Sequence, residues 1–419
     1  MHVFIIIFIL KIASSCNGIL PQYFPANQEQ ELTRNEAIIN YFRLGFTAPE
    51  ILAFLVTLHG VQLSLRQLRR ILRNNGCQRR ANPSNINEVA QVIEEQLGGS
   101  GRILGYRAMH QRLINDHNLV VTRDVVRRVL KILDPEGVEY RSTHRLRRRK
   151  YHTKGPNYLW HIDGYDKLKP YGFCVHGAID GFSRKVLWLE VASSNNNPRI
   201  VAQYYLDYVR QIDGAPRIVR GDRGTENVHI EVIQQFFRRS ADDDFSAGKS
   251  FMYGRSTANQ RIEAWWSILL KQCTDWWIKY FKDLRDRGLF SDEDIIHQEC
   301  LKFCFMDLLT HELHKVAQHW NTHRIRPSTN SESPSGRPDI LYFLPQVNNT
   351  QDYATPVSLD EIEIAEEEFA EPPPRKGCSA YFNELVEMIM QDERLEMPKT
   401  AAEAENLYIT LLSLIDELS

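Results

Sequence analysis

The residue with the clearest potential for chemistry is Asp163, which lies inside the apolar and aromatic stretch NYLWHIDGYDKL at residues 157–168. A carboxylate in such a strand-like run is costly to bury as an anion. It therefore needs a proton, an ion pair or a metal ion. We expect its partners to come from other parts of the chain.

Two later segments supply candidate partners. Asp222 ends an apolar run in PRIVRGDRGTEN, and Glu263 lies one turn into the amphipathic helix predicted for TANQRIEAWWSILLKQ. Asp222 follows Asp163 by 59 residues and Glu263 follows Asp222 by 41, so only a folded α/β core could bring them together. Three close carboxylates repel one another unless divalent cations lie between them, and two such cations suit in-line phosphoryl transfer. Oxygen ligands favour two Mg²⁺ or Mn²⁺ ions over zinc.

Other acids near these positions have simpler explanations. Asp166 is three residues beyond Asp163, so strand alternation sends it to the opposite face. Asp180 follows a strand, where we expect it to cap a turn. Glu226 begins a helix, where the helix dipole would stabilise it.

The helix that carries Glu263 holds further candidates. Asn259, one turn earlier, could orient the Glu263 carboxylate or contact a phosphate. Four tryptophans are expected to pack in the core or an interface; they are Trp265, Trp266, Trp276 and Trp277.

A strand-rich region must position the acids. Three strand-like runs, YLWHIDGYDKL, FCVHGAID and KVLWLEVA, are separated by short turns, which predicts an antiparallel meander. A helix, the strand PRIVRGD, another helix, the short strand SFMYG and a long helix from about residue 257 follow. This order predicts an α/β fold with a mixed five-stranded, ribonuclease H-like sheet and flanking helices.

The segment 157–285 resembles the integrase catalytic core of retroviruses, retrotransposons and related DDE transposases. WHIDGYDKL is similar to the first-strand motif of that family, IDGFSRKV to the turn after the second strand, RGDRGTEN to the second aspartate motif and NQRIEAWW to the glutamate helix. The resemblance implies that Asp163, Asp222 and Glu263 are catalytic and bind two Mg²⁺ ions. It implies DNA cleavage and strand transfer on double-stranded DNA, with both element ends and target as substrates, by a homo-oligomer.

The chain departs from the retroviral pattern in three respects. The second interval is longer, and residues 239–249 are the expected insertion. Retroviral lysines that follow the glutamate are replaced by Ser267 and Leu270, so Arg261 or Lys271 is the predicted DNA contact. Paired helical modules stand where retroviral enzymes have an N-terminal zinc module.

Two helix-turn-helix modules are predicted, at residues 33–82 and 87–140. An offset of 58 residues aligns Ser64 with Thr122, and the pair Arg69 and Arg70 with Arg127 and Arg128. A capped helix with outward arginines suits the major groove of DNA, whereas the simpler alternative is a pair of plain three-helix bundles.

Charge is segregated along the chain although the net charge is only −2. Residues 61–154 carry 20 Lys or Arg against 8 Asp or Glu, whereas residues 346–419 carry 4 against 17. The linker 141–157, with Arg147, Arg148 and Arg149, could track phosphates, serve as a tether or direct nuclear import. The acidic tail 346–419 is predicted to be disordered over residues 346–375, with one or two late helices.

The remaining segments give weaker signals. Residues 1–32 begin with a short apolar run that imitates a signal peptide, so a secretory route is the alternative to a nuclear location. Residues 158–330 would form the core with its trailing helices, and residues 331–345 a closing segment. We expect no membrane span. A zinc site is a minor alternative for the cluster of His297, Cys300, Cys304, His311 and His314.

Three functions compete at this point. The first is a metal-dependent integrase or transposase. The second is a catalytically silent, domesticated DNA-binding protein derived from a mobile element. The third is an interaction module whose basic region binds RNA or a protein.

Overall fold

The computed structural model describes residues 33–78, 83–140, 153–254, 259–327 and 334–418. The signal-like start and Arg147, Arg148 and Arg149 lie outside these residues. The chain forms two compact units, Met1–Pro156 with Gln318–Asp352, and Asn157–Ala317 with Tyr353–Ser419. We treat each unit separately.

The second unit is built on the expected sheet. Its strands are β1 (Trp160–Tyr165), β2 (Cys174–Asp180), β3 (Val186–Ala192), β5 (Val219–Gly221) and β6 (Phe251–Tyr253), in the order β3-β2-β1-β5-β6. The first three strands form an antiparallel meander, and β5 and β6 run parallel to β1. A two-stranded ribbon joins β4 (Gly214–Ala215) to β7 (Thr355–Pro356). The ribonuclease H-like prediction is therefore confirmed.

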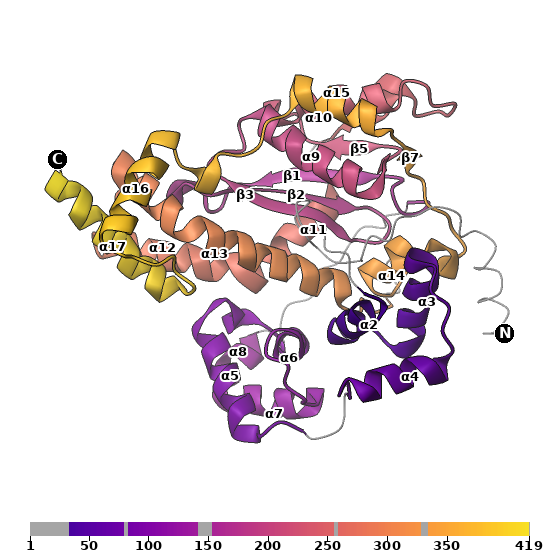
Figure 1. Cartoon of the computed structure of the whole chain (residues 1–419), viewed down its shortest axis with the longest axis horizontal. Helices are drawn as coiled ribbons and strands as arrows, with labels where there is room; N and C mark the ends of the chain where they lie inside the picture. Colours follow the sequence, from indigo (N-terminus) through magenta and orange to yellow (C-terminus); the bar gives the residue numbers. More distant parts are fainter. Residues whose placement is uncertain (1–32, 79–82, 141–152, 255–258, 328–333, 419) are drawn as a thin grey trace. The chain divides into compact units, whose positions relative to one another are not determined.

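Helices cover both faces of this sheet (Figure 1). Helices α9 (Pro198–Ile212) and α10 (Val228–Phe237) cover one face, and α11 (Gln260–Leu269), α12 (Asp275–Asp286) and most of α13 (Ile295–Thr322) lie on the other. Trp160 on β1 is fully buried and packs edge-on against Trp188 of β3 and Tyr205 of α9. This aromatic layer fixes β1 in the centre of the sheet.

The acidic tail is ordered, so the prediction of disorder over residues 346–375 was wrong. Helix α15 (Leu359–Phe369) begins at a capping box between Ser358 and Glu361 and buries Ile362 and Ala365. Its acids meet basic side chains of the core: Glu366 pairs with Arg210 and Glu361 with Arg239. Composition alone missed this because the acidic face is neutralised by residues that are distant in sequence.

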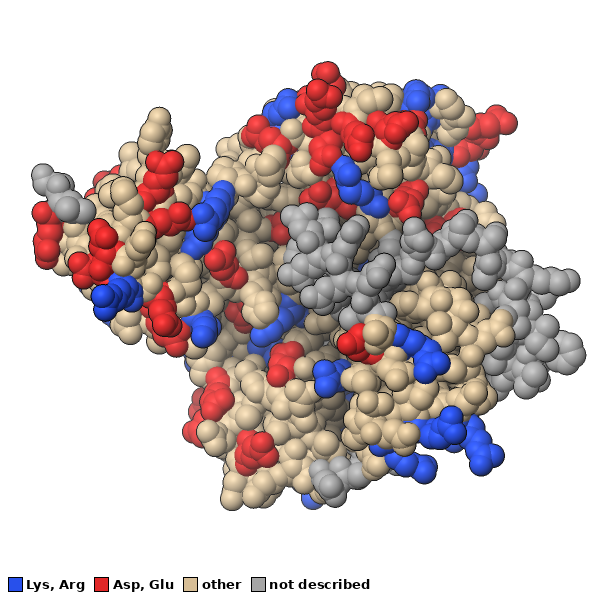
Figure 2. Space-filling model, viewed as in Figure 1, with Lys and Arg blue, Asp and Glu red and all other residues tan. Residues whose placement is uncertain are grey.

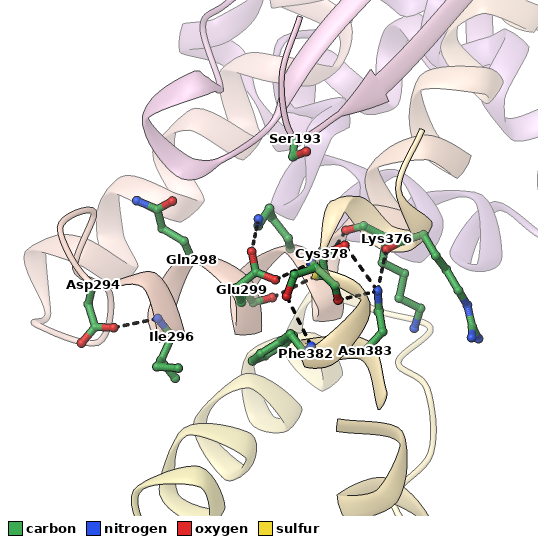
Figure 3. Close-up of polar contacts among 12 residues, drawn as sticks. Ser193, Asp294, Ile296, Gln298, Glu299, Lys376, Cys378, Phe382 and Asn383 are labelled. Carbon is green, nitrogen blue, oxygen red and sulfur yellow. Dashed lines mark hydrogen bonds and ion pairs between the residues drawn. The ribbon is translucent and has the colours of Figure 1, made fainter. Parts of the chain in front are cut away.

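The rest of the tail is also helical, with α16 (Ala380–Asp392) and α17 (Ala401–Leu418). Figure 3 shows how its first part attaches to α13. The Ser379 backbone N–H donates to Glu299 Oε2 at 2.9 Å, and Cys378 Sγ donates to the Glu299 carbonyl oxygen at 3.4 Å. Asn383 donates to the Arg375 carbonyl oxygen at 3.1 Å, which closes the loop before α16.

The first unit contains both predicted helical modules. The first module comprises α2 (Arg34–Arg43), α3 (Ala48–His59) and α4 (Leu65–Asn74), with Leu344 packed into its core beside α14 (Pro338–Phe343). The second comprises α5 (Ile86–Gly98), α6 (Tyr106–Asn115), α7 (Arg123–Leu133) and α8 (Pro135–Tyr140) around a separate core. Among the helices of the described residues, none is long and apolar enough to cross a membrane.

Candidate active site

Asp163 lies near the middle of β1, directly opposite Gly177 of β2. The strand is buried on both faces except around this residue, which is half-buried. The indole Nε1–H of Trp266 on α11 donates to Asp163 Oδ2 at 2.9 Å. The carboxylate is therefore held from the helix that also carries Glu263.

The three predicted acids share one electrostatic environment. The pKa of Asp163 is raised to about 7, chiefly by burial and also by the negative charges of Asp222 and Glu263, whereas the Trp266 hydrogen bond opposes this rise. Burial and the charge of Asp222 likewise raise the pKa of Glu263, although its side chain is exposed. Since charge interactions fall with distance, all three carboxylates face one region of the fold.

Asp222 follows the last residue of β5 and is held by the turn after it. Its Oδ1 accepts from the Gly224 backbone N–H at 3.1 Å and from Asn227 Nδ2 at 3.2 Å. The same Asn227 amide group, which is fully buried, donates to Glu226 Oε1 at 3.2 Å. Asn227 is thus a positioning residue that the sequence did not single out.

Glu226 lies near Asp222 and also at the start of a helix. It sits in a 3₁₀ turn, Thr225–Asn227, just before α10, as expected for a helix-start residue. Burial raises its pKa, and the charge of the neighbouring Asp222 contributes. Asp222 and Glu226 therefore form a pair of acids bridged by one amide.

Asn259 attaches the start of α11 to β1. Its Nδ2 donates to the Ile162 carbonyl oxygen at 2.9 Å, and its Oδ1 accepts from His161 Nδ1 at 2.5 Å. Burial lowers the pKa of His161 to about 3, so the imidazole is neutral. Asn259 is only 1% exposed. The buried amide therefore attaches the start of α11, the helix that carries Glu263, to β1, and its burial disfavours the phosphate contact predicted from the sequence.

The residues present suit divalent cations in type and charge. Asp163, Asp222 and Glu263 offer only oxygen ligands, and their mutual repulsion is the charge excess that Mg²⁺ or Mn²⁺ would neutralise. Within the described residues, no three acidic, histidine or cysteine side chains already stand at metal-ligand spacing.

The other acids predicted to be structural have local partners. Asp180 Oδ2 accepts from the backbone N–H groups of Phe182 and Ser183 at 3.1 and 2.7 Å, which confirms that it caps the turn. Asp166 is exposed and pairs with Lys169 at 3.2 Å.

The predicted DNA-contacting residues near α11 differ in their environment. Arg261 Nε donates to the Gly181 carbonyl oxygen at 3.1 Å, so this side chain supports the turn between β2 and β3. Lys271 is exposed in a π-helical segment, Leu270–Thr274, which separates α11 from α12. Lys271 is therefore the better placed of the two for a nucleic-acid contact.

The histidine and cysteine cluster is engaged in packing. His297 Nδ1 lies 2.8 Å from the Tyr408 hydroxyl of α17, and His314 lies beside Glu190 at 3.2 Å. Cys300 and Cys304 are buried in the core, where burial raises the pKa of the Cys300 thiol to about 12. Through these contacts the histidines and cysteines connect α13 to neighbouring elements.

The paired arginines of α4 and α7 are exposed as predicted, but the two helices differ in their acidic residues. On α4, Arg69 and Arg70 are exposed, and the helix contains no acidic residue. Figure 2 shows basic side chains grouped over this helix. On α7, both Arg127 and Arg128 pair with Asp124, at 2.8 and 2.6 Å.

A comparison with known protein families gave a match. Residues 150–352 match the family model described as an integrase core domain. The match supports an integrase core of the retroviral and retrotransposon type in this segment. A comparison with curated proteins gave no significant match.

Proposed function

We propose that this protein is a DDE-type integrase or transposase that cleaves DNA phosphodiesters and transfers DNA strands with divalent metal ions. The observation that carries the proposal is the convergence of Asp163, Asp222 and Glu263, whose charges act on one another from β1, the end of β5 and α11. The integrase core match over residues 150–352 supports the same chemistry.

Each acid has a distinct role in this proposal. Asp163, central in the sheet, would be a ligand common to two cations, and Asp222 and Glu263 would each help to hold one of them. Bound Mg²⁺ or Mn²⁺ would activate the attacking water or 3′-hydroxyl and stabilise the leaving oxygen. Asn227, Asn259 and the Trp266 indole hold the acids in place.

The helical modules would deliver duplex DNA to this site. The exposed Arg69 and Arg70 of α4, together with Arg127 and Arg128 of α7, are the proposed phosphate and groove contacts. Lys271 and the basic linker with Arg147, Arg148 and Arg149 would add further contacts. Action on chromosomal target DNA implies a nuclear location. Because two DNA ends must be held together, the proposal also implies self-association.

A labelled duplex with an element end tests the proposal. The full chain would be incubated with Mg²⁺ or Mn²⁺, comparing wild type with Asp222→Asn and Glu263→Gln, and both products and duplex binding would be measured. We expect metal-dependent cleavage or joining in the wild type only, with equal duplex binding in all three proteins. Equal binding without any metal-dependent product in the wild type would instead identify a silent DNA-binding protein.

A further inference from the structure

We infer that Trp266 is a positioning residue for metal binding, because its indole N–H sets the orientation of the Asp163 carboxylate. The inference rests on the proposed function, since it concerns how Asp163 is presented to the cations. It assigns a role to a tryptophan that the sequence predicts only as a packing residue.

The contact leaves Asp163 free to bind ions. Trp266 Nε1–H donates to Oδ2 at 2.9 Å, and this bond uses one of the lone pairs of that oxygen. The Gly164 backbone N–H also donates to this carboxylate, and the remaining lone pairs of its two oxygens stay available for cations. A hydrogen bond from outside the ligand set typically fixes the rotation of a metal-binding carboxylate and strengthens metal binding.

The fold makes room for the indole at this place. Gly177, the partner of Asp163 on β2, has no side chain, and a Cβ there would lie 2.8 Å from Trp266 Cη2. A side chain at residue 177 would therefore displace the ring from the carboxylate. The missing side chain at Gly177 of β2 thus leaves the space that the Trp266 ring of α11 occupies.

A second contact, with the ring of Tyr165, also holds the indole. The ring of Tyr165, two residues after Asp163, lies 5.2 Å from the ring of Trp266 between centroids. The Tyr165 hydroxyl lies 2.7 Å from Thr274 Oγ1, in the π-helical segment that follows α11. Trp266 is 7% exposed, so the ring is clamped and is not presented as a platform for bases.

Calorimetry with Mg²⁺ alone tests the inference on the full chain without DNA. Trp266→Phe keeps a ring but removes the N–H donor, and Trp265→Phe makes the same change at the neighbouring buried position of α11. We expect Trp266→Phe to weaken Mg²⁺ binding by about 10- to 100-fold, and Trp265→Phe to leave it within about 2-fold. Unchanged Mg²⁺ affinity in Trp266→Phe would overturn the inference.

Indole N–H resonances give a second measurement that does not depend on the folding of a Trp266 variant. The chain has seven tryptophans, and we expect one indole N–H resonance to shift both on Mg²⁺ addition and on the Asp163→Asn substitution. Mg²⁺ binding to the wild type with no indole resonance responding would reject the role of Trp266 while leaving the proposed function intact. A wild type whose carboxylates bind no Mg²⁺ at all would reject both.

Discussion

At the scale of single residues, Asp163 is a carboxylate that the folded protein holds at a cost. Burial and the two neighbouring acids raise its pKa to about 7. In an unfolded chain an aspartate has a pKa of about 3.9. The ionised form therefore disfavours folding above about pH 4, and the penalty grows until the pH passes the folded-state pKa.

This shift predicts a pH-dependent gain of stability when Asp163 is replaced. Without divalent ions, Asp163→Asn should be more stable than the wild type at pH 8 by roughly 2–4 kcal/mol, because the amide carries no charge. The difference should shrink as the pH falls and disappear at about pH 3 and below, under both pKa values, where Asp163 is mostly protonated in the folded and the unfolded state. Mg²⁺ should raise the unfolding temperature of the wild type and not of the variant. Thermal unfolding across pH measures all three effects; equal stability at pH 8 would contradict the raised pKa.

The sequence identified the acids but not the groups that hold them. Asp163, Asp222 and Glu263 were recognisable because each interrupts a patterned apolar segment. Asn227 and Trp266 act through hydrogen bonds to residues 5 and 103 positions away, and their own segments read as an ordinary helix start and a packing face. Such contacts depend on tertiary geometry, which periodicity does not encode.

At the scale of secondary structure, the five strands and the helices of the core follow directly from the sequence pattern. Alternation and turn residues predicted β1, β2 and β3, and the capping residues Ser64 and Thr122 predicted α4 and α7. Helix α15 was missed because its acidic composition resembles a solvated chain. Only burial of Ile362 and pairing with core arginines distinguish it.

Helix α15 offers a matched pair of isoleucines for testing its attachment. Ile362 is fully buried, whereas Ile364 is 54% exposed on the same helix. Ile362→Ala should cost roughly 2–5 kcal/mol of local stability, and Ile364→Ala less than about 0.5 kcal/mol. Hydrogen exchange of the α15 amides would measure both. Similar protection in the two variants would contradict the packing described for this helix.

The arginine-bearing helices α4 and α7 should contribute unequally to DNA affinity. Asp124 already pairs with Arg127 and Arg128, whereas no acidic residue of α4 opposes Arg69 and Arg70. Replacing Arg69 and Arg70 together by Ala should weaken duplex binding and reduce the slope of log affinity against log salt by about 2. The same double change at Arg127 and Arg128 should have a smaller effect.

Duplex binding titrated over a range of salt concentrations compares the two double variants directly. Equal slopes for both would show that Asp124 does not offset the second pair. An unchanged slope in both would show that neither helix contacts phosphates.

At the scale of the whole molecule, the chain combines regions of opposite charge whose sum is only −2. Much of the acidic charge lies on helices of the second unit, where part of it is neutralised by Arg210 and Arg239 of the core. Figure 2 shows acidic side chains gathered over α15. From Tyr353 onward the acidic tail is thus a structural part of the second unit.

The rate of DNA cleavage in Asp163→Asn, compared with Asp166→Asn, tests the central claim most directly. Both changes remove one carboxylate charge within three residues, but Asp163 is half-buried and feels the charges of Asp222 and Glu263, whereas Asp166 is exposed and pairs with Lys169. We predict that Asp163→Asn lowers the single-turnover rate with Mg²⁺ by at least about 100-fold, since losing the shared ligand removes several kcal/mol of transition-state stabilisation. Asp166→Asn should stay within about 3-fold of wild type. Equal rates in Asp163→Asn and wild type would contradict the three-carboxylate site.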